Sequence, residues 1–350
     1  MTDILRELLE TRPWLLADGA TGTGLFEMGL QSGDAPELWN IDYPDRIEAH
    51  YRGFVDAGSD IVLTNSFGGT RHRLSLHQAQ NRVQELNERA AAILRKVIDE
   101  SGRTVVAAGS MGPTGEILRP VGTLGFDEAV AAFAEQARAL KDGGVDVLWI
   151  ETMSSKEEVQ AAVQGASETG LPVVTCFSID TNGRTMMGVS AQEIIAMQPA
   201  LSPVPMACGT NCGIGAAEVV SAILQMNQAR DKGPHKPVLV AKANCGIPRY
   251  VGGKIVYSGT PELMAEYARL AYASGATIIG GCCGTTAEHV RAMRRALEEQ
   301  EREPLPDIDT VVRRLGAVTE GMRAQVSGVA PSQQGAVRRS RRRASRGESA

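Results

Sequence analysis

Two adjacent cysteines, Cys282 and Cys283, stand between glycines in the stretch "GGCCGT". Successive side chains of a strand point to opposite faces, so neighbouring thiols converge on one point only where a strand has just ended. Glycine permits such a break because it adopts positive φ angles and allows close backbone approach. The stretch therefore predicts a strand end that directs two sulfur atoms at one target.

A third cysteine, Cys212 in "GTNCG", ends another predicted strand. Three thiolates can surround one tetrahedral zinc ion, and sulfur ligands select zinc over magnesium or calcium. Three protein ligands leave one position open, which is typical of a catalytic site. Cys245 also ends a strand here and is a fourth ligand, a reactive bystander or a core residue, whereas Cys176 and Cys208 are interpreted as core residues. The alternative for the adjacent pair is a redox-active vicinal disulfide.

The elements that must position these thiols are short apolar strands that alternate with amphipathic helices. Near-continuous apolar runs are typical of parallel strands buried on both faces. Helices are predicted at residues 82–99, 126–141, 156–168, 216–230, 261–274 and 286–299. Eight strands are predicted at residues 14–18, 60–65, 104–110, 145–152, 172–179, 205–211, 237–244 and 276–281.

Eight strand–helix units predict a single-domain (β/α)8 TIM barrel of the α/β class, with a doubly wound sheet as the alternative. Polar and glycine-rich residues follow the carboxyl end of nearly every strand, and in a barrel these ends meet at one face, where active sites lie. We predict that residues 1–315 form the barrel. Residues 316–350 are rich in arginine and are predicted to form a disordered tail, with weak docking to acidic partners as an alternative.

The composition restricts the class of protein. The 350 residues carry a formal net charge of −5, which gives no reason to expect a nucleic-acid partner. No apolar run approaches the roughly 18 residues that a membrane helix needs. The N-terminus lacks the pattern of a signal peptide, and six cysteines without a secretion signal favour the reducing cytoplasm.

The motifs "DGATGT", "LTNSFGGTR", "GPTGE", "GTNC" and "GGCCGT", in this order, resemble those of the homocysteine S-methyltransferase family. The resemblance covers residues 14–297 and is greatest to the homocysteine-binding barrel of cobalamin-dependent methionine synthases; betaine–homocysteine methyltransferases are also similar. It implies that Cys212, Cys282 and Cys283 are catalytic and bind one zinc ion per chain. The chain departs from the family at Cys245, where alanine is usual.

The resemblance also implies substrate-binding residues. Asp18 and Glu151 match the acidic residues that hold the amino group of homocysteine. The backbone amides of Gly19, Ala20 and Thr21 match those that receive its carboxylate. Asn65 and Asn211 match positions that line the same mouth.

The implied reaction is attack of zinc-bound homocysteine thiolate on an activated methyl group, which yields methionine. The methyl donor is expected to be a methyl-corrinoid such as methylcobalamin on a partner protein, because the chain shows no corrinoid-binding module of its own. Betaine, S-methylmethionine and S-adenosylmethionine are the alternatives. The positions that match betaine-binding aromatics fall near Asp34, Gly68 and Thr152, none of which is aromatic, although Trp39 and Tyr43 lie close in sequence. A non-catalytic zinc- or thiol-binding subunit of a methyl-transfer complex is the remaining alternative.

Overall fold

The computed structural model describes residues 3–180, 182–233, 236–246, 248–251, 254–299 and 301–328. Eight parallel strands form one sheet in the order β1-β10-β7-β6-β5-β4-β3-β2. A further parallel bridge joins Ala17 to Ile61, beside β1 and β2, so that the sheet closes on itself. The closed sheet confirms the predicted (β/α)8 barrel and excludes the open, doubly wound alternative. The strands are β1 (Leu15–Leu16), β2 (Ile61–Leu63), β3 (Val106–Met111), β4 (Val147–Met153), β5 (Val173–Phe177), β6 (Ala207–Cys212), β7 (Val238–Ala243) and β10 (Ile278–Gly281).

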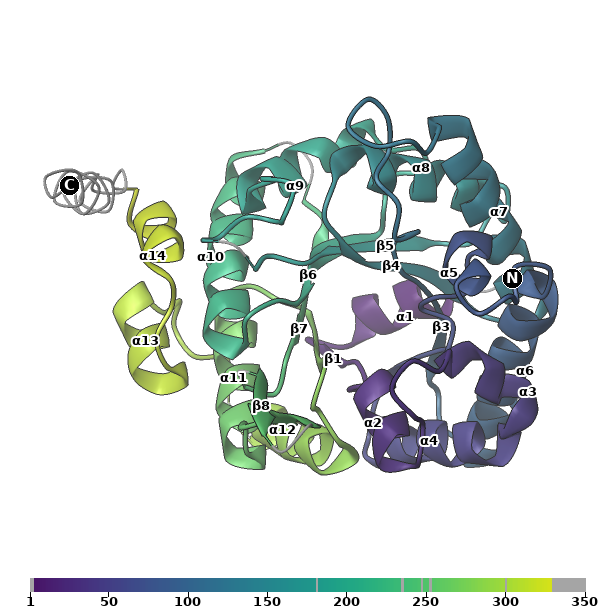
Figure 1. Ribbon diagram of the computed structural model, residues 1–350. Coiled ribbons are helices and arrows are strands. Elements are labelled where there is room, and N and C mark those ends of the chain that lie inside the picture. The colour runs from purple at the N-terminus through teal and green to yellow at the C-terminus, as the bar shows by residue number, and fades with distance from the viewer. Residues whose placement is uncertain are drawn as a thin grey trace, which may run out of the picture.

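Helices surround this ring of strands (Figure 1). Each of the six predicted helices is present, and several begin at residues whose side chains cap the first turn. Thr260, for example, accepts a hydrogen bond from the Leu263 amide ahead of Pro261. The helices are α1 (Ile4–Thr11), α2 (Gly22–Glu27), η1 (Pro36–Leu38), α3 (Trp39–Asp42), α4 (Pro44–Asp56), α5 (Arg71–Ser75), α6 (Val83–Ser101), α7 (Phe126–Asp142), α8 (Lys156–Ser167), α9 (Ala191–Met197), η2 (Gln198–Ala200), α10 (Ala216–Lys232), α11 (Pro261–Ala273), α12 (Ala287–Glu299), α13 (Ile308–Leu315) and α14 (Glu320–Ser327).

The alternation of side chains along the strands separates two cores. One set packs inside the barrel with Leu5 and Leu8 of α1, which lies behind the strands in Figure 1. Its members are Leu15, Ala17, Ile61, Leu63, Val106, Ala108, Val147, Trp149, Val174, Cys176, Ala207, Val240 and Ile278. The intervening residues, such as Leu16 and Cys208, belong to the larger core that packs against the outer helices. Any strand residue in phase with the first set therefore points toward the barrel axis.

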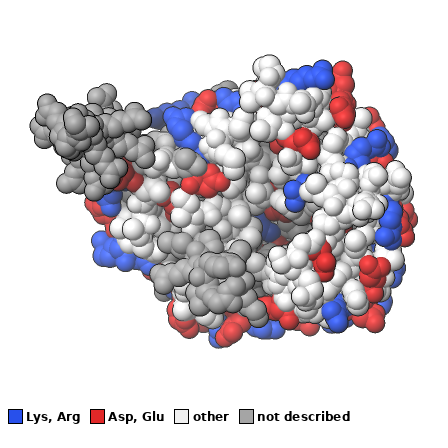
Figure 2. Space-filling view, in the orientation of Figure 1, with Lys and Arg blue, Asp and Glu red and all other residues white. Residues whose placement is uncertain are grey.

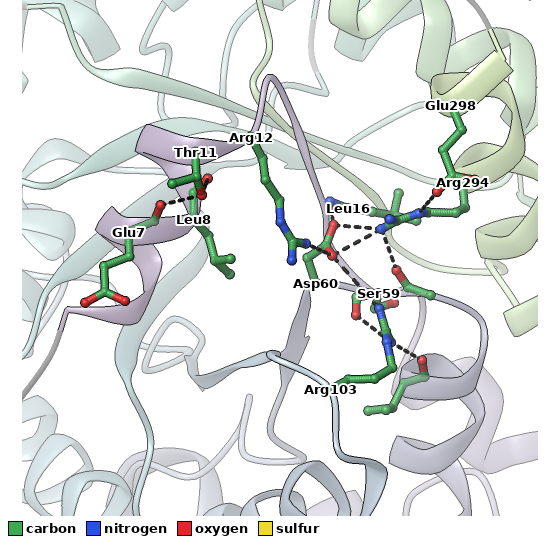
Figure 3. Close-up of polar contacts among 12 residues, drawn as sticks. Glu7, Leu8, Thr11, Arg12, Leu16, Ser59, Asp60, Arg103, Arg294 and Glu298 are labelled. Atoms are coloured by element: carbon green, nitrogen blue, oxygen red, sulfur yellow. Dashed lines mark hydrogen bonds and ion pairs between the residues drawn. The ribbon is translucent and has the colours of Figure 1, made fainter.

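A buried aspartate ties the barrel together at the amino ends of its strands (Figure 3). Asp60, directly before β2, is fully buried and accepts hydrogen bonds from Arg12 at 2.6 Å, from Arg294 at 3.1 Å and from the Leu16 amide at 2.9 Å. Arg103 lies 4.0 Å from the same carboxylate. These residues come from four separate parts of the chain, so one carboxylate joins the end of α1, β1, β2 and α12 at the face opposite the mouth.

Two features differ from the sequence-based prediction. An antiparallel hairpin of β8 (Pro248–Val251) and β9 (Lys254–Tyr257) follows β7 and was not predicted. The region predicted to be a disordered tail from residue 316 contains α14, because Met322 is buried and Thr319 caps the helix. The Thr319 amide also bonds to Glu218 of α10 at 2.6 Å. The remaining part of that prediction, residues 329–350, lies outside the described residues.

On the described part of the mouth face, acidic and basic side chains are interspersed around the edge (Figure 2). Neither sign of charge forms a continuous stripe there. In the part of the chain that the structure describes, no helix combines the length and apolar character needed to cross a membrane.

Candidate metal centre and substrate cavity

Three cysteine side chains meet at the carboxyl ends of β6 and β10. Cys212 is the last residue of β6, and Cys282 and Cys283 follow β10 directly. Their Sγ atoms all lie within 4.8 Å of one another, and each residue is half-buried. Strand alternation alone would not achieve this convergence; Cys212 instead adopts a left-handed conformation with φ of 61°, which turns its side chain away from the strand pattern.

The backbone around the adjacent pair is tightly fixed. The Cys282 amide donates to Ala243 O of β7 at 2.7 Å, and Cys283 O accepts from the Cys245 amide at 2.9 Å. Gly281 leaves no room for a side chain, because a Cβ atom would lie 2.2 Å from Cγ2 of buried Thr285. The glycines of "GGCCGT" thus allow the chain to pack closely where the two thiols leave the strand.

The electrostatic surroundings of the thiols favour a bound cation. A hydrogen bond with Cys282 lowers the pKa of Cys212, but the bond with Cys283 and burial outweigh it and raise that pKa to about 12. For Cys283 the bond with Cys212 lowers the pKa, whereas the bond with Cys282 and burial raise it to about 12. Three thiols this close therefore lose their protons together only when another positive charge takes the place of the protons. A metal ion that binds thiolates provides such a charge.

The other cysteines lie outside this cluster. Cys245 is buried in the outer core, its sulfur would lie 2.7 Å from a Cβ atom on Gly259, and burial raises its pKa to about 11. It is not part of the group of three that can hold a metal ion in the described part of the chain. Cys176 lies in the inner core and Cys208 in the outer core, which confirms the prediction that both are core residues.

Asp18 lies behind the cavity wall. One carboxylate oxygen accepts from Lys242 Nζ at 2.6 Å and the other from the Leu63 amide at 2.7 Å. Burial raises the pKa of Asp18, and the charge of Lys242 opposes that shift. Burial lowers the pKa of Lys242, but the charges of Asp18 and Glu151 more than offset it, so the pKa of Lys242 is raised and its ammonium group stays charged beside Asp18.

Glu151, near the end of β4, faces the cavity. One oxygen accepts from Ser110 Oγ at 2.6 Å, and the other has only a long contact of 3.5 Å with Asn211 Nδ2. Burial raises its pKa, and the charge of Lys242 opposes this. Glu151 therefore keeps an oxygen available for a further hydrogen-bond donor.

Asn211 lies next to Glu151 and holds the backbone that follows it. Its side-chain oxygen accepts from the Thr152 amide at 2.8 Å, and its Nδ2 donates to Thr152 Oγ1 at 2.8 Å. Thr152 has a left-handed φ of 61°, at the point where the pairing of β4 with β5 shifts register. Asn211 Nδ2 also lies 4.0 Å from Cys282 Sγ, so this side chain connects the carboxylate to the thiol cluster.

A cavity of about 430 Å³ opens in front of these groups. The structure places eight of the ten predicted site residues on its wall: Gly19, Ala20, Thr21, Asn65, Glu151, Cys212, Cys282 and Cys283. The other two, Asp18 and Asn211, lie directly behind it.

Two of the predicted substrate-binding groups already have partners within the protein. The Ala20 amide donates to Thr285 O at 3.0 Å, so this predicted group is already satisfied within the protein. Asn65 Nδ2 donates to Pro36 O at 2.7 Å and to Asn40 Oδ1 at 3.0 Å, so Asn65 holds the wall in place.

Several lining residues were not predicted from the sequence. Lys242 stands in "VLVAKAN", where a lysine two residues after inward-facing Val240 was the available signal. Glu37 is buried, accepts from the Gly68 amide at 2.6 Å, and has its pKa raised by burial. Further lining residues toward the outer part are Asp34, Phe67, Arg73 and His77. Trp39 and Tyr43 are not on this wall; their rings contact each other in a tilted arrangement, with the Arg46 guanidinium over both rings.

The sequence and the fold of this chain are similar to those of known proteins. Residues 15–297 match the sequence profile of the family described as homocysteine S-methyltransferase. The chain is 31% identical over 319 residues to methionine synthase of Mycobacterium tuberculosis, a match that covers 86% of this chain and 26% of that protein. Methionine synthase of Mycobacterium leprae is 30% identical, with 85% and 25% covered. The chain thus spans about a quarter of the length of these relatives.

The fold is also shared with solved structures. The metallated form of the homocysteine methyltransferase MmuM from Escherichia coli superimposes with a TM-score of 0.67 at 24% identity, covering 83% of this chain and 99% of that one. The apo form of the same enzyme gives a TM-score of 0.65 at 23% identity, over 84% of this chain and 99% of that chain.

Proposed function

Because the chain belongs to the homocysteine S-methyltransferase family, we propose that it methylates the sulfur of homocysteine with the help of one zinc ion. The observation that carries the proposal is the cluster of Cys212, Cys282 and Cys283, three half-buried sulfurs within 4.8 Å of one another on the wall of the cavity. Zinc–sulfur bonds near 2.3 Å in tetrahedral geometry require sulfurs roughly 3.8 Å apart, which this cluster reaches with small side-chain adjustments. MmuM, which shares this fold, has a metallated form.

The three cysteines would hold the ion, and the ion would supply the positive charge that favours the thiolate form of the substrate sulfur. Glu151 would bind the substrate ammonium, with the charge of Asp18 behind it, and the amides of Gly19 and Thr21 would receive the carboxylate. These contacts orient the substrate sulfur toward the cavity, so that it attacks the donor methyl carbon in line. A new S–C bond forms, the bond between that carbon and the donor breaks, and its electron pair leaves with the donor.

The first candidate donor is a methyl-corrinoid carried by a partner protein. The similarity to methionine synthases supports it, since this chain corresponds to about a quarter of those proteins and the corrinoid would approach the open mouth. The second candidate is a small quaternary ammonium donor of the betaine type. On the outer wall, Phe67, Glu37 and Asp34 would offer an aromatic ring and carboxylates to a cation, although Arg73 and His77 line the same wall. The proposal includes a reducing, cytoplasmic location, since the three thiols must stay unoxidised.

The test combines metal analysis with a donor screen. Purified protein is expected to hold one zinc ion per chain, and Cys212→Ala is expected to lose both the zinc and the activity. Cys245→Ala is the matched control, because Cys245 ends a neighbouring strand but lies outside the cluster, and it should keep both.

Zinc-loaded protein and homocysteine are then offered methylcobalamin, betaine, S-methylmethionine and S-adenosylmethionine in turn, and methionine is measured. Methionine formed from one donor alone identifies the donor class. Metal-free protein with a reversible disulfide between Cys282 and Cys283 would instead favour the redox alternative. Zinc binding without methionine from any donor, even after addition of cell extract, would favour a non-catalytic subunit.

A further inference from the structure

Three charged side chains make up what we call the floor: Glu151 and Lys242, which line the cavity, and Asp18, which lies directly behind it. All three are buried, with exposed fractions of 8%, 2% and 1%. Two carboxylates and one ammonium leave the floor with one net negative charge. A buried charge without a counter-ion is costly, so this surplus is suited to one incoming cation.

Lys242 is placed at this floor by the barrel itself. It is in phase with inward-facing Val240 on β7, and in the parallel sheet it lies beside Asn211 of β6 and Gly280 of β10. Its ammonium group makes its ion pair with Asp18 at 2.6 Å and lies 5.7 Å from the centre of the Trp149 ring. Of this ion pair, Lys242 lines the cavity and Asp18 lies behind it.

The two carboxylates of the floor therefore differ in availability. Both oxygens of Asp18 already accept short hydrogen bonds, from Lys242 and from the Leu63 amide. Glu151 has one short bond, from Ser110, and one long contact of 3.5 Å. An incoming ammonium group thus meets Glu151 directly and senses Asp18 only as a charge behind Lys242.

We infer that Lys242 is a specificity-determining residue that sets the floor to a single negative charge, so that the site selects a thiol whose chain carries one ammonium group, held by Glu151. Lys242 acts through Asp18, whose charge it neutralises, and is not a ligand of the substrate carboxylate. A carboxylate at Lys242 would lie beside Asp18 and Glu151, where like charges oppose it. The inference rests on the proposed function, because the substrate sulfur must be at the cysteine cluster for its ammonium group to reach the floor.

The test compares Asp18→Asn with the double variant Asp18→Asn/Lys242→Met in zinc-loaded protein. Asp18→Asn keeps the oxygen that accepts from the Leu63 amide and makes the floor neutral. The double variant removes both charges of the ion pair, which restores one net negative charge and is often neutral for stability. Binding of homocysteine, of 4-mercaptobutanoate, which lacks the ammonium group, and of 3-aminopropanethiol, which lacks the carboxylate, is measured by calorimetry.

Asp18→Asn is expected to weaken homocysteine binding by about tenfold or more, because a unit charge a few ångströms away is lost. The same variant should reduce the discrimination against 4-mercaptobutanoate. The double variant is expected to return the homocysteine dissociation constant to within about threefold of wild type, since the local field is restored. Exposed Glu10→Gln, which changes the total charge by one unit far from the floor, should leave all three affinities unchanged.

A double variant that binds homocysteine more weakly than Asp18→Asn would overturn the inference. That result would mean that Asp18 or Lys242 contacts the substrate directly. If wild-type protein binds homocysteine but the double variant does not recover that affinity, only this inference is refuted. Zinc-loaded wild-type protein that binds none of the three thiols sinks the proposed function as well.

Discussion

Replacement of Asp60 by asparagine is expected to destabilise the barrel without altering the chemistry at its mouth. Asp60 is fully buried at the amino ends of the strands, where it faces the guanidinium groups of Arg12, Arg103 and Arg294. The substitution leaves these three positive charges around a neutral amide. It also turns an NH2 group toward donors that the carboxylate accepted from, namely the arginines and the Leu16 amide.

The magnitude follows from the geometry. Removal of one member of a buried ion pair costs about 3–5 kcal/mol. The arginine side chains are 37%, 35% and 26% exposed, so water screens part of that loss. The expected decrease in the free energy of unfolding is therefore about 2–3 kcal/mol, which corresponds to a fall in Tm of roughly 3–4 °C for a chain of 350 residues.

The assay is urea denaturation followed by circular dichroism, with zinc content and homocysteine binding measured on the same samples. Glu10→Gln, an exposed acid on α1 near the same face, is the control and should change the free energy of unfolding by less than about 0.5 kcal/mol. An unchanged unfolding midpoint for Asp60→Asn would refute the view that this carboxylate stabilises the barrel by linking separate elements. A stable variant that had lost its zinc would refute the separation of the two faces.

Two further outcomes follow from single buried positions. Burial lowers the pKa of His50 to about 4 from 6.5, so the unfolded chain takes up this proton at a higher pH than the folded protein does. Wild-type stability should therefore fall between pH 6.5 and about 4, by on the order of 3 kcal/mol from this group, and His50→Leu should flatten the profile in that window; an unaltered slope would contradict this. Gly281→Ala places a Cβ atom 2.2 Å from Thr285 and should displace the adjacent thiols, seen as weaker zinc binding. Gly53→Ala, on α4 with open space around it, is the matched control and should raise the free energy of unfolding by about 0.5–1 kcal/mol with zinc binding unchanged.

The strands were predictable because their residues carry the pattern that a buried parallel sheet requires. Runs such as "VDVLWI" supply apolar side chains to both faces, and each of the eight predicted strands overlaps an observed one. The meeting of Cys212 with Cys282 and Cys283 was also predictable, since the carboxyl ends of barrel strands share one face. Helix α14 was missed because its apolar content is low and an eight-residue helix depends on contacts with the rest of the barrel, such as the bond between Thr319 and Glu218. The hairpin β8–β9 was missed because each of its strands has only four residues.

The surroundings of Asp18 were not predictable for a different reason. A motif match indicates the type of residue at a position but not the partner that lies across the barrel, 224 residues away along the chain. Lys242 in a run of small and apolar residues is compatible with either face of the sheet until the register of β7 is known. The partner of Asp18, and thus the net charge beside the cavity, is fixed by register and not by local sequence.

The position of Cys212 depends on a single backbone angle. Cys208, four residues earlier on β6, lies in the outer core, and strand alternation would send Cys212 to that same side, away from the cavity. The left-handed φ of 61° turns it toward the mouth, although this conformation costs a residue with a side chain about 1–2 kcal/mol. The proposed zinc ion would offset this strain, because coordination by thiolates contributes folding free energy. Packing alone would favour the extended conformation that the rest of β6 adopts. The strained angle at Cys212 is thus better explained by a functional role of its thiol at the cavity wall.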